Sequence, residues 1–279
     1  GLSGGCSSAN EAQEVTGKRT KSAASSYVAI ACWLDLLGYG GAIDKAGFDP
    51  AHPLAQLPLR RLRAFHRIVS KHSSAGFPTL VMNDGAVAYS NVELVRSDKV
   101  WRFVERCWAL YQEATTTDRR SGGPGLRGVI AVGLRAKGSN RAIVAQDKEL
   151  TAIIEDLVAG RIDKQKALAN ARKVRRVFDI IPQLQANFAF SRAYEAEQAG
   201  SAAGFPGPNL YLDTAVFARD VPDWIVAGQP IAWTPKKASL ATSFIAIRGI
   251  ENVSDEVAHA TLRSGQQLLE LLCFNAEPH

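Results

Sequence analysis

Alternating apolar patterns divide the chain into strand-like and helix-like segments. Residues 27–34 are almost wholly apolar, and this short run of bulky side chains predicts a strand that is buried on both faces. Residues 58–73 place leucine, phenylalanine and valine on one stripe with arginines around it, which predicts an amphipathic helix. Two short apolar runs, 77–82 and 86–89, flank an Asn-Asp-Gly sequence and predict a β-hairpin.

The rest of the chain continues this mixture of helices and strands. Residues 97–114 have apolar side chains at a spacing of three and four, and this pattern predicts a helix. Further segments are predicted as a strand at 126–134, a helical pair at 148–181, a helix at about 185–199, strands at 210–217, 230–234 and 243–247, and a last helix from Ser254. This order predicts one α+β domain over 27–279, with a helical insert at about 148–181.

Composition narrows the class of protein only moderately. The chain has 279 residues, 46% of them hydrophobic, and a net charge of +6. These values exclude a disordered or collagen-like chain, and no run of about 18 apolar residues predicts a membrane span. We expect residues 1–26 to form a flexible tail. The polar start without a secretory signal and the four widely spaced cysteines predict a cytoplasmic protein with reduced thiols.

Two aspartates stand at the ends of predicted strands. Asp35 ends the first buried strand, and Asp84 lies at the tip of the hairpin. If these strands are neighbours in one sheet, the two carboxylates converge at one edge. Hard divalent cations such as Mg²⁺ prefer oxygen ligands of this kind. Taken alone, an aspartate after a strand or in a tight turn is more often a turn residue, so the pair is a hypothesis at this stage.

The motifs around these aspartates resemble those of class III nucleotidyl cyclase domains. The segment 33–40 (WLDLLGYG) is similar to the family's first strand, F-x-D-[IL]-x-G-[FY], and the hairpin at 83–85 is similar to its second metal-binding aspartate. The segment 127–133 (RGVIAVG) resembles the following strand, and 188–197 (FAFSRAYEAE) resembles the helix after it. The resemblance therefore covers residues 27 to about 200, in the family's order.

This resemblance implies a fold, a reaction and a set of residues. It implies a ferredoxin-like βαββαβ core and two Mn²⁺ or Mg²⁺ ions per site, held by Asp35, Asp84 and the main-chain carbonyl of Leu36. Residues Gly38, Tyr39 and Gly40 would receive the β- and γ-phosphates. The 3′-hydroxyl of a nucleoside triphosphate would attack its own α-phosphate and release pyrophosphate. The site would form between two antiparallel protomers of a homodimer.

The sequence departs from the family at the residues that read the base and position the α-phosphate. The family's helix motif, N-x-x-x-R, supplies an asparagine for the ribose and an arginine for the α-phosphate. The nearest match here is Asn187 and Arg192, which are one residue too far apart. The strand before Asp84 lacks the lysine or glutamate with which adenylate and guanylate cyclases read a purine.

A site without purine-reading residues is similar to the pyrimidine cyclases of the Pycsar anti-phage systems. This resemblance implies cyclic UMP, or next cyclic CMP, as the product, and a downstream effector protein that binds it. Two alternatives remain open: an adenylate or guanylate cyclase with unusual base contacts, and a cyclase-like sensor module without catalysis. We expect no membrane as partner, because the chain has no long apolar run. We expect no nucleic acid either, because basic residues that alternate with apolar ones, as at 60–67, usually form the solvated face of a helix.

Overall fold

The computed structural model describes residues 26–136, 145–174, 181–235 and 241–274. The described residues divide into two compact units, one within the ranges 1–136 and 186–279 and the other within the range 137–185. The predicted flexible tail lies outside the described residues up to position 25. Within the described residues, no helix is both long and apolar enough to cross a lipid bilayer.

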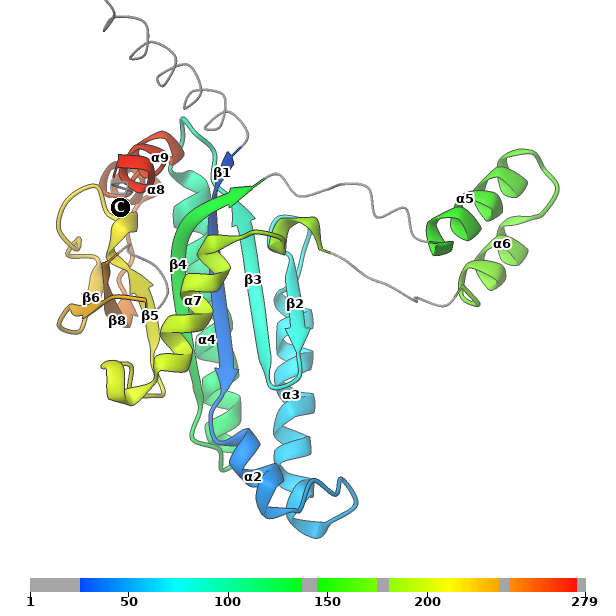
Figure 1. Ribbon diagram of the computed structural model, residues 1–279, viewed down its shortest axis with the longest axis horizontal. Helices are drawn as coiled ribbons and strands as arrows, with labels where there is room; N and C mark the ends of the chain where they lie inside the picture. The colour runs from blue at the N-terminus through cyan, green and yellow to red at the C-terminus, as the bar shows by residue number, and fades with distance from the viewer. Residues whose placement is uncertain (1–25, 137–144, 175–180, 236–240, 275–279) are drawn as a thin grey trace, which may run out of the picture. The chain divides into compact units, whose positions relative to one another are not determined.

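A mixed sheet forms the centre of the first unit (Figure 1). Its strand order within the described residues is β2-β3-β1-β4-β5-β8-β6, and β7 also pairs with β8. The strands are β1 (Ser26–Leu36), β2 (Thr79–Met82), β3 (Gly85–Asn91), β4 (Leu126–Ala136), β5 (Leu210–Asp213), β6 (Ile225–Ala227), β7 (Ile231–Trp233) and β8 (Thr242–Ile250). The pairs β1–β3, β1–β4 and β2–β3 are antiparallel, whereas β4–β5 is parallel.

The predicted ferredoxin-like core is confirmed by this topology. Helix α3 (Gln56–His72) connects toward β2, and helix α4 (Asp98–Arg120) connects β3 to β4, so the core runs β1-α3-β2-β3-α4-β4 with the short helix α2 (Tyr39–Lys45) before α3. The connection through α3 joins β1 to β2, and β3 lies between these two strands in the sheet. The connection through α4 joins β3 to β4, and β1 lies between them, which gives the sheet order β2-β3-β1-β4. The strands β5 to β8 then extend this sheet beyond β4.

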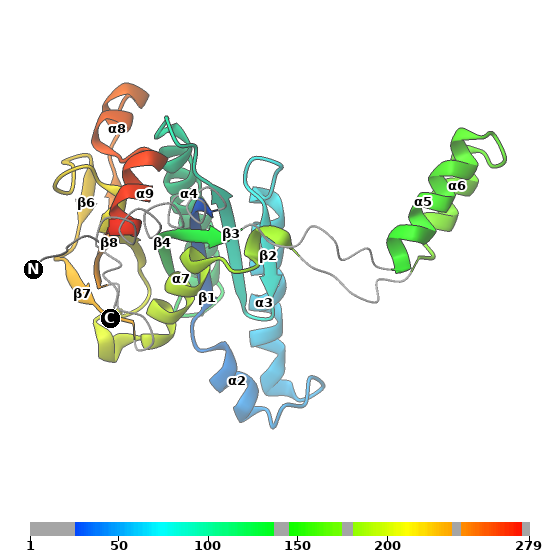
Figure 2. The same ribbon diagram turned by 45° about the horizontal axis from the view of Figure 1, so that its top comes forward.

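Helices cover both faces of the sheet (Figure 2). Helices α3 and α4 lie on one face, and α7 (Phe188–Ala199) lies over β1 and β4 on the other. The side chains of β1 alternate accordingly: Leu34 belongs to the core under α4, while Trp33 contacts aromatic rings of α7. Gly133 allows α7 to approach β4, because a Cβ there would lie 2.6 Å from the backbone nitrogen of Ala189.

Two predicted boundaries differ from the structure, and two elements, α2 and β6, lie in segments where the sequence predicts no helix or strand. Gly40 and Gly41 are helical because they belong to α2. The predicted strand at 210–217 ends at Asp213, whose side chain accepts a hydrogen bond from the N–H of Ala215 and caps a 3₁₀ turn. The predicted last helix is interrupted, since Leu262 adopts an extended conformation and pairs with Phe217. This interruption separates α8 (Asp255–Thr261) from α9 (Gly265–Phe274).

The second unit contains two helices of the predicted insert. These are α5 (Ala145–Val158) and α6 (Lys164–Ala171), followed by a 3₁₀ turn at Pro182–Leu184. Asp163 caps α6 by accepting a hydrogen bond from the N–H of Lys166. The second helix of the pair was predicted to continue to residue 181, but it ends at Ala171, and residues 175–180 lie outside the described part of the chain.

Candidate functional site

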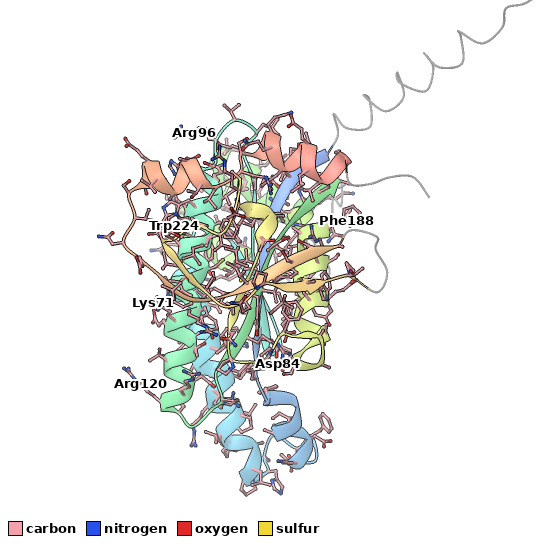
Figure 3. All side chains as sticks on the ribbon, turned by 90° about the vertical axis from the view of Figure 1, so that its left-hand side faces the viewer. Lys71, Asp84, Arg96, Arg120, Phe188 and Trp224 are labelled. Carbon is pink, nitrogen blue, oxygen red and sulfur yellow. The ribbon has the colours of Figure 1, made fainter. Side chains whose placement is uncertain are left out.

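Asp35 and Asp84 meet at one end of the sheet, as their positions at strand ends predict. Asp35 is opposite Gly85 in the pairing of β1 with β3, and Gly85 directly follows Asp84. The N–H of Leu36 also donates a hydrogen bond to the carbonyl oxygen of Asp84 (3.0 Å). The turn between β2 and β3 is therefore held against the end of β1, and Figure 3 shows Asp84 at the end of the sheet next to α2.

A tight turn and a close packing contact fix the position of Asp84. Asn83 adopts a left-handed backbone conformation (φ 54°), which suits an asparagine in a two-residue hairpin turn, and its side-chain amide donates to Oδ1 of Asp84 (3.1 Å). The glycine at 85 is required by packing, because a Cβ there would lie 2.2 Å from the indole ring of Trp33. Sequence alone predicts the turn but not this contact.

Asp35 lies in a charged and largely buried setting. Burial, and after it the neighbouring carboxylates of Glu197 and Asp84, raise the pKa of Asp35 to about 7, while the guanidinium of Arg127 acts in the opposite direction. Arg127 is opposite Asp35 in the pairing of β1 with β4. Two carboxylates that lie close together and partly out of water are costly unless a cation or a proton compensates their charge.

Glu197 and Arg127 are the residues of this site that sequence patterns did not indicate as functional. Glu197 is fully buried on α7, and its Oε1 accepts a hydrogen bond from Nε of Arg127 (2.8 Å). Nη1 of Arg127 also donates to the carbonyl oxygen of Phe205 (3.2 Å). Arg127 is the first residue of the strand motif at 127–133, and that motif could have pointed to it. Glu197 lies seventy positions from Arg127, and no local sequence pattern links the two residues.

The glycine-containing segment after β1 lies beside the aspartate pair. Gly38 has a left-handed backbone (φ 71°) and stands at the start of α2. Tyr39 is buried, and its pKa is raised by this burial and by the nearby carboxylate of Asp84. Gly40 is exposed, and a Cβ added there would meet no atom within 4 Å. The fold therefore does not require a glycine at position 40.

The loop before α2 is held by a buried ion pair. Nε of Arg61 donates to Oδ1 of Asp118 (2.7 Å), and its Nη2 donates to the carbonyl oxygen of Leu37 (2.8 Å). The N–H of Leu37 in turn donates to the carbonyl oxygen of Gly125 (3.2 Å). This network connects α3, α4 and the segment that follows Asp35, so the segment has a defined position without a ligand.

Arg192 lies far from the aspartate pair of the same chain. Its Nη1 donates to the carbonyl oxygen of Val132 (2.8 Å), and its Nη2 forms an ion pair with the buried Asp213 (3.2 Å). Val132 is five positions along β4 from Arg127, which is opposite Asp35. At about 3.3 Å per residue, this places the Arg192 contact roughly 16 Å from the level of Asp35.

Asn187 lies further still along the same face. It caps α7, with its side-chain oxygen accepting a hydrogen bond from the N–H of Phe190 (3.0 Å). Asn187 also bridges to Arg135. Arg135 is eight positions from Arg127, or roughly 26 Å along the strand. The structure therefore brings Asp35, Asp84 and Tyr39 together, and it keeps Asn187 and Arg192 apart from them within one chain.

The chemistry of the aspartate pair fits a hard divalent cation. Neither carboxylate forms an ion pair within the described residues, and Asp35 and Asp84 are both only partly exposed. No group of three or more His, Cys, Asp or Glu side chains suited to a metal occurs in the described part of the chain. A bound ion would therefore depend on two carboxylates, main-chain oxygens and the oxygens of a ligand, as is common for Mg²⁺.

Comparisons with known proteins give only distant structural similarities. No protein-family model and no curated protein sequence matches the chain. The guanylyl cyclase Cya2 is 12% identical, covering 81% of this chain and 94% of its own, with a TM-score of 0.44. The adenylyl cyclase CyaB from P. aeruginosa is 11% identical, covering 82% and 97%, with a TM-score of 0.45.

A third similar structure is the guanylate cyclase domain of RhGC from Catenaria anguillulae in complex with GTP. It is 8% identical and covers 81% of this chain and 99% of its own, with a TM-score of 0.42. Similarities this distant do not identify the activity of this chain.

Proposed function

We propose that this chain is a metal-dependent nucleotidyl cyclase, which converts a nucleoside triphosphate to its 3′,5′-cyclic nucleotide and pyrophosphate. The observation that carries the proposal is the meeting of Asp35 and Asp84 at one end of a ferredoxin-like sheet, beside the Gly38–Gly40 segment. The motifs that resemble class III cyclases are thus adjacent in space as well as ordered along the chain.

Asp35, Asp84 and the main-chain carbonyl of Leu36 would hold two Mn²⁺ or Mg²⁺ ions. When bound, these ions supply positive charge that stabilises the triphosphate and polarises the α-phosphate. Tyr39 and the backbone of Gly38 and Gly40 would position the β- and γ-phosphates. A glycine at position 40 supports this role, because the fold leaves open space there into which a ligand can approach the backbone.

The reaction forms one bond and breaks one bond at the α-phosphorus. The 3′-hydroxyl oxygen attacks the phosphorus, the bond to the bridging oxygen of the β-phosphate breaks, and pyrophosphate leaves with both bonding electrons. The hydroxyl proton passes to solvent. Positioning and electrostatic stabilisation account for most of the catalysis in phosphoryl transfer. The residues at this end of the sheet would supply the positioning.

The place of Arg192 supports a site shared between two chains of a homodimer. Arg192 would stabilise the charge on the α-phosphate, and Asn187 would orient the ribose, but both lie far from Asp35 in their own chain. They can serve the same substrate only if a second copy presents them to the aspartate pair. We therefore propose that each active site combines Asp35 and Asp84 of one protomer with Asn187 and Arg192 of its partner.

Mixing two inactive variants tests this arrangement. We expect Asp84→Asn and Arg192→Lys each to abolish turnover alone. If the site is shared, a one-to-one mixture should regain about a quarter of wild-type activity, because half of the dimers carry both variants and each of these has one intact site. A mixture that stays inactive although the two chains exchange would overturn the shared site and leave the metal assignment untouched.

The substrate proposed is a pyrimidine nucleotide, with UTP favoured over CTP, and the product would act through an effector protein in anti-phage defence. The absence of a purine-reading lysine or glutamate before Asp84 supports this choice. The test is incubation of the purified chain with Mn²⁺ and ATP, GTP, CTP or UTP, followed by mass spectrometry. Cyclic UMP or cyclic CMP supports the proposal, and cyclic AMP or cyclic GMP retains the cyclase but overturns the pyrimidine substrate.

A module without catalysis is the second candidate function. The observation that favours it is that Arg192 is already engaged by Asp213 and by the carbonyl of Val132. Absence of product from all four nucleotides, in a folded and dimeric protein that binds Mn²⁺, would support this second function over the first.

A further inference from the structure

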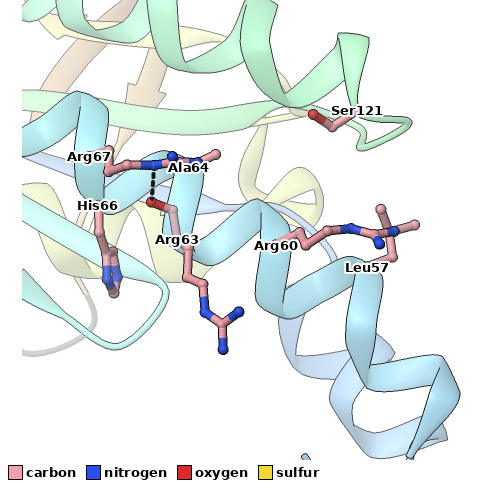
Figure 4. Close-up of a pocket in the computed structure, with 7 residues that line it drawn as sticks. All are labelled: Leu57, Arg60, Arg63, Ala64, His66, Arg67 and Ser121. Carbon is pink, nitrogen blue, oxygen red and sulfur yellow. Dashed lines mark hydrogen bonds between the residues drawn. The ribbon is translucent and has the colours of Figure 1, made fainter.

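A groove along α3 carries positive charge that the proposed catalytic site does not use. It has a volume of about 860 Å³ and is lined by Leu57, Arg60, Arg63, Ala64, His66, Arg67 and Ser121 (Figure 4). Ser121 follows the end of α4, next to the exposed Arg119 and Arg120. Within the described residues, none of these arginines forms an ion pair with a carboxylate.

Four residues of the groove, three of them exposed and Ala64 half-buried, follow a helix-pairing pattern. Leu57, Arg60, Ala64 and Arg67 are spaced by three, four and three residues, so they form one stripe along α3. The adjacent side of α3 is occupied, because Phe65, Ile68 and Val69 are buried in the core. The stripe therefore runs along the flank of α3 beside its buried side, with the small Ala64 between Arg60 and Arg67 and the apolar Leu57 at its end.

Further along α3, one positive charge on the same stripe is paired with a carboxylate of this chain. Lys71 continues the spacing, and its Nζ donates to both carboxylate oxygens of Glu113 on α4 (2.8 and 2.9 Å). At Lys71 the protein supplies the acidic partner itself. At Arg60 and Arg67, which precede Lys71 on α3, no carboxylate of the described residues forms an ion pair.

The directions of the arginines indicate an extended ligand rather than a compact one. In Figure 4, Arg60 and Arg67 run along the side of α3 that faces Ser121, whereas Arg63 and His66 point away from it. The guanidinium groups do not converge on one point, so a single phosphate would reach only one of them. Leu57 to Arg67 span about 15 Å of helix, which matches a ligand with several spaced negative charges.

We propose that this groove binds an acidic amphipathic helix of a partner protein. A helix packed along the stripe would place apolar residues against Leu57 and Ala64, and the small Ala64 allows close approach. Carboxylates at the same spacing would lie opposite Arg60 and Arg67, where guanidinium groups can bind them through two hydrogen bonds each. A nucleic acid fits less well, because the groove offers an apolar floor and no tyrosine, tryptophan or phenylalanine for stacking on bases.

Binding of synthetic probes to the full chain tests the proposal without any enzymatic measurement. The probe is a helical peptide of about 18 residues with leucine and glutamate alternating at the three-four spacing. The comparison probes are the same peptide with glutamine for glutamate, and a short DNA duplex. We expect the glutamate peptide to bind at least tenfold more tightly than the glutamine peptide.

Charge variants then locate the binding surface. The triple variant Arg60→Gln, Arg63→Gln, Arg67→Gln should weaken peptide binding at least tenfold. A control with the same charge change at exposed arginines elsewhere, Arg102→Gln, Arg219→Gln, Arg248→Gln, should change it less than twofold. Thermal unfolding of both triple variants checks that they remain folded.

Three outcomes would overturn the proposal. The first is that the glutamate peptide does not bind the wild-type chain, and the second is that it binds both triple variants equally well. Tighter binding of the DNA duplex, with affinity falling steeply as salt rises, would assign the groove to nucleic acid instead. None of these outcomes depends on cyclase activity, so they leave the proposed function to its own tests.

Discussion

The N–H of Leu36 donates a hydrogen bond to the carbonyl oxygen of Asp84, and this contact joins the two motifs on which the proposed function depends. Residues almost fifty positions apart are held together here by backbone atoms. The carboxylates of Asp35 and Asp84 are therefore positioned by the sheet itself. Their arrangement does not depend on a flexible loop or on a bound ligand.

Removal of one carboxylate should abolish both metal binding and turnover. We expect Mn²⁺ to raise the melting temperature of the wild-type chain, because a ligand that binds only the folded state stabilises it. The Asp84→Asn variant should fold normally and show neither this shift nor any cyclic product. Differential scanning fluorimetry with and without Mn²⁺, together with mass spectrometry of products, measures both effects. An unchanged Mn²⁺ shift in the variant would remove the metal assignment.

The contribution of Asp35 to the stability of the metal-free chain should fall as the pH rises from about 4 to about 7. In the folded state Asp35 keeps its proton to a pKa of about 7, whereas in the unfolded state it loses it near 3.8. Over this range the folded state binds more protons, so rising pH favours unfolding. Asp35→Asn removes this contribution and should stabilise the metal-free chain at pH 8 by about 1–2 kcal/mol, a value reduced for partial exposure to solvent.

Chemical denaturation of the wild-type chain and of Asp35→Asn at several pH values, in the presence of a chelator, measures this difference. The two stability curves should converge below pH 4 and separate as the pH approaches 7. Parallel curves would show that Asp35 titrates near its ordinary pKa in the folded protein.

Gly40→Ala should separate stability from activity. Gly40 is helical, has an ordinary negative φ, and has open space around the position of a Cβ. Alanine there should leave stability unchanged or raise it by about 0.5 kcal/mol, because glycine is a poor helix former. If phosphates approach this backbone, the same variant should raise the KM for the nucleotide. A variant with unchanged KM would place the triphosphate elsewhere.

Breaking the Arg127–Glu197 pair should destabilise the fold strongly. Glu197 is fully buried, and its removal leaves the largely buried guanidinium of Arg127 without its carboxylate. We expect Glu197→Ala to lower the free energy of unfolding by about 3 kcal/mol. The double variant Arg127→Met, Glu197→Leu should lose less, because neither charge then remains buried alone. Urea denaturation of both variants makes the comparison, and equal losses would contradict the unpaired-charge explanation.

The sequence by itself determined most of the strands and helices and their order, but not α2 or β6. The apolar run before Asp35, the Asn-Asp-Gly turn and the three-four spacing of α3 and α4 each reflect a local rule of backbone or side-chain geometry. These rules predict that Asp35 and Asp84 converge only if β1 and β3 are neighbours, and the ferredoxin-like order that makes them neighbours was implied by the resemblance to cyclases. The boundary errors occur where tertiary contacts override local preference, as at Leu262, which pairs with Phe217.

Only the tertiary structure decided which side chains surround the aspartates. Glu197 reaches Arg127 because α7 packs on β4 beside Gly133, and no local pattern encodes a contact across seventy positions. Arg192 binds Asp213 because of the same packing of α7 on the sheet. The spacing of the sequence motifs does not predict how far this ion pair lies from Asp35. Ion pairs of this kind depend on how helices pack on the sheet, and that packing is the result of the whole core rather than of any one segment.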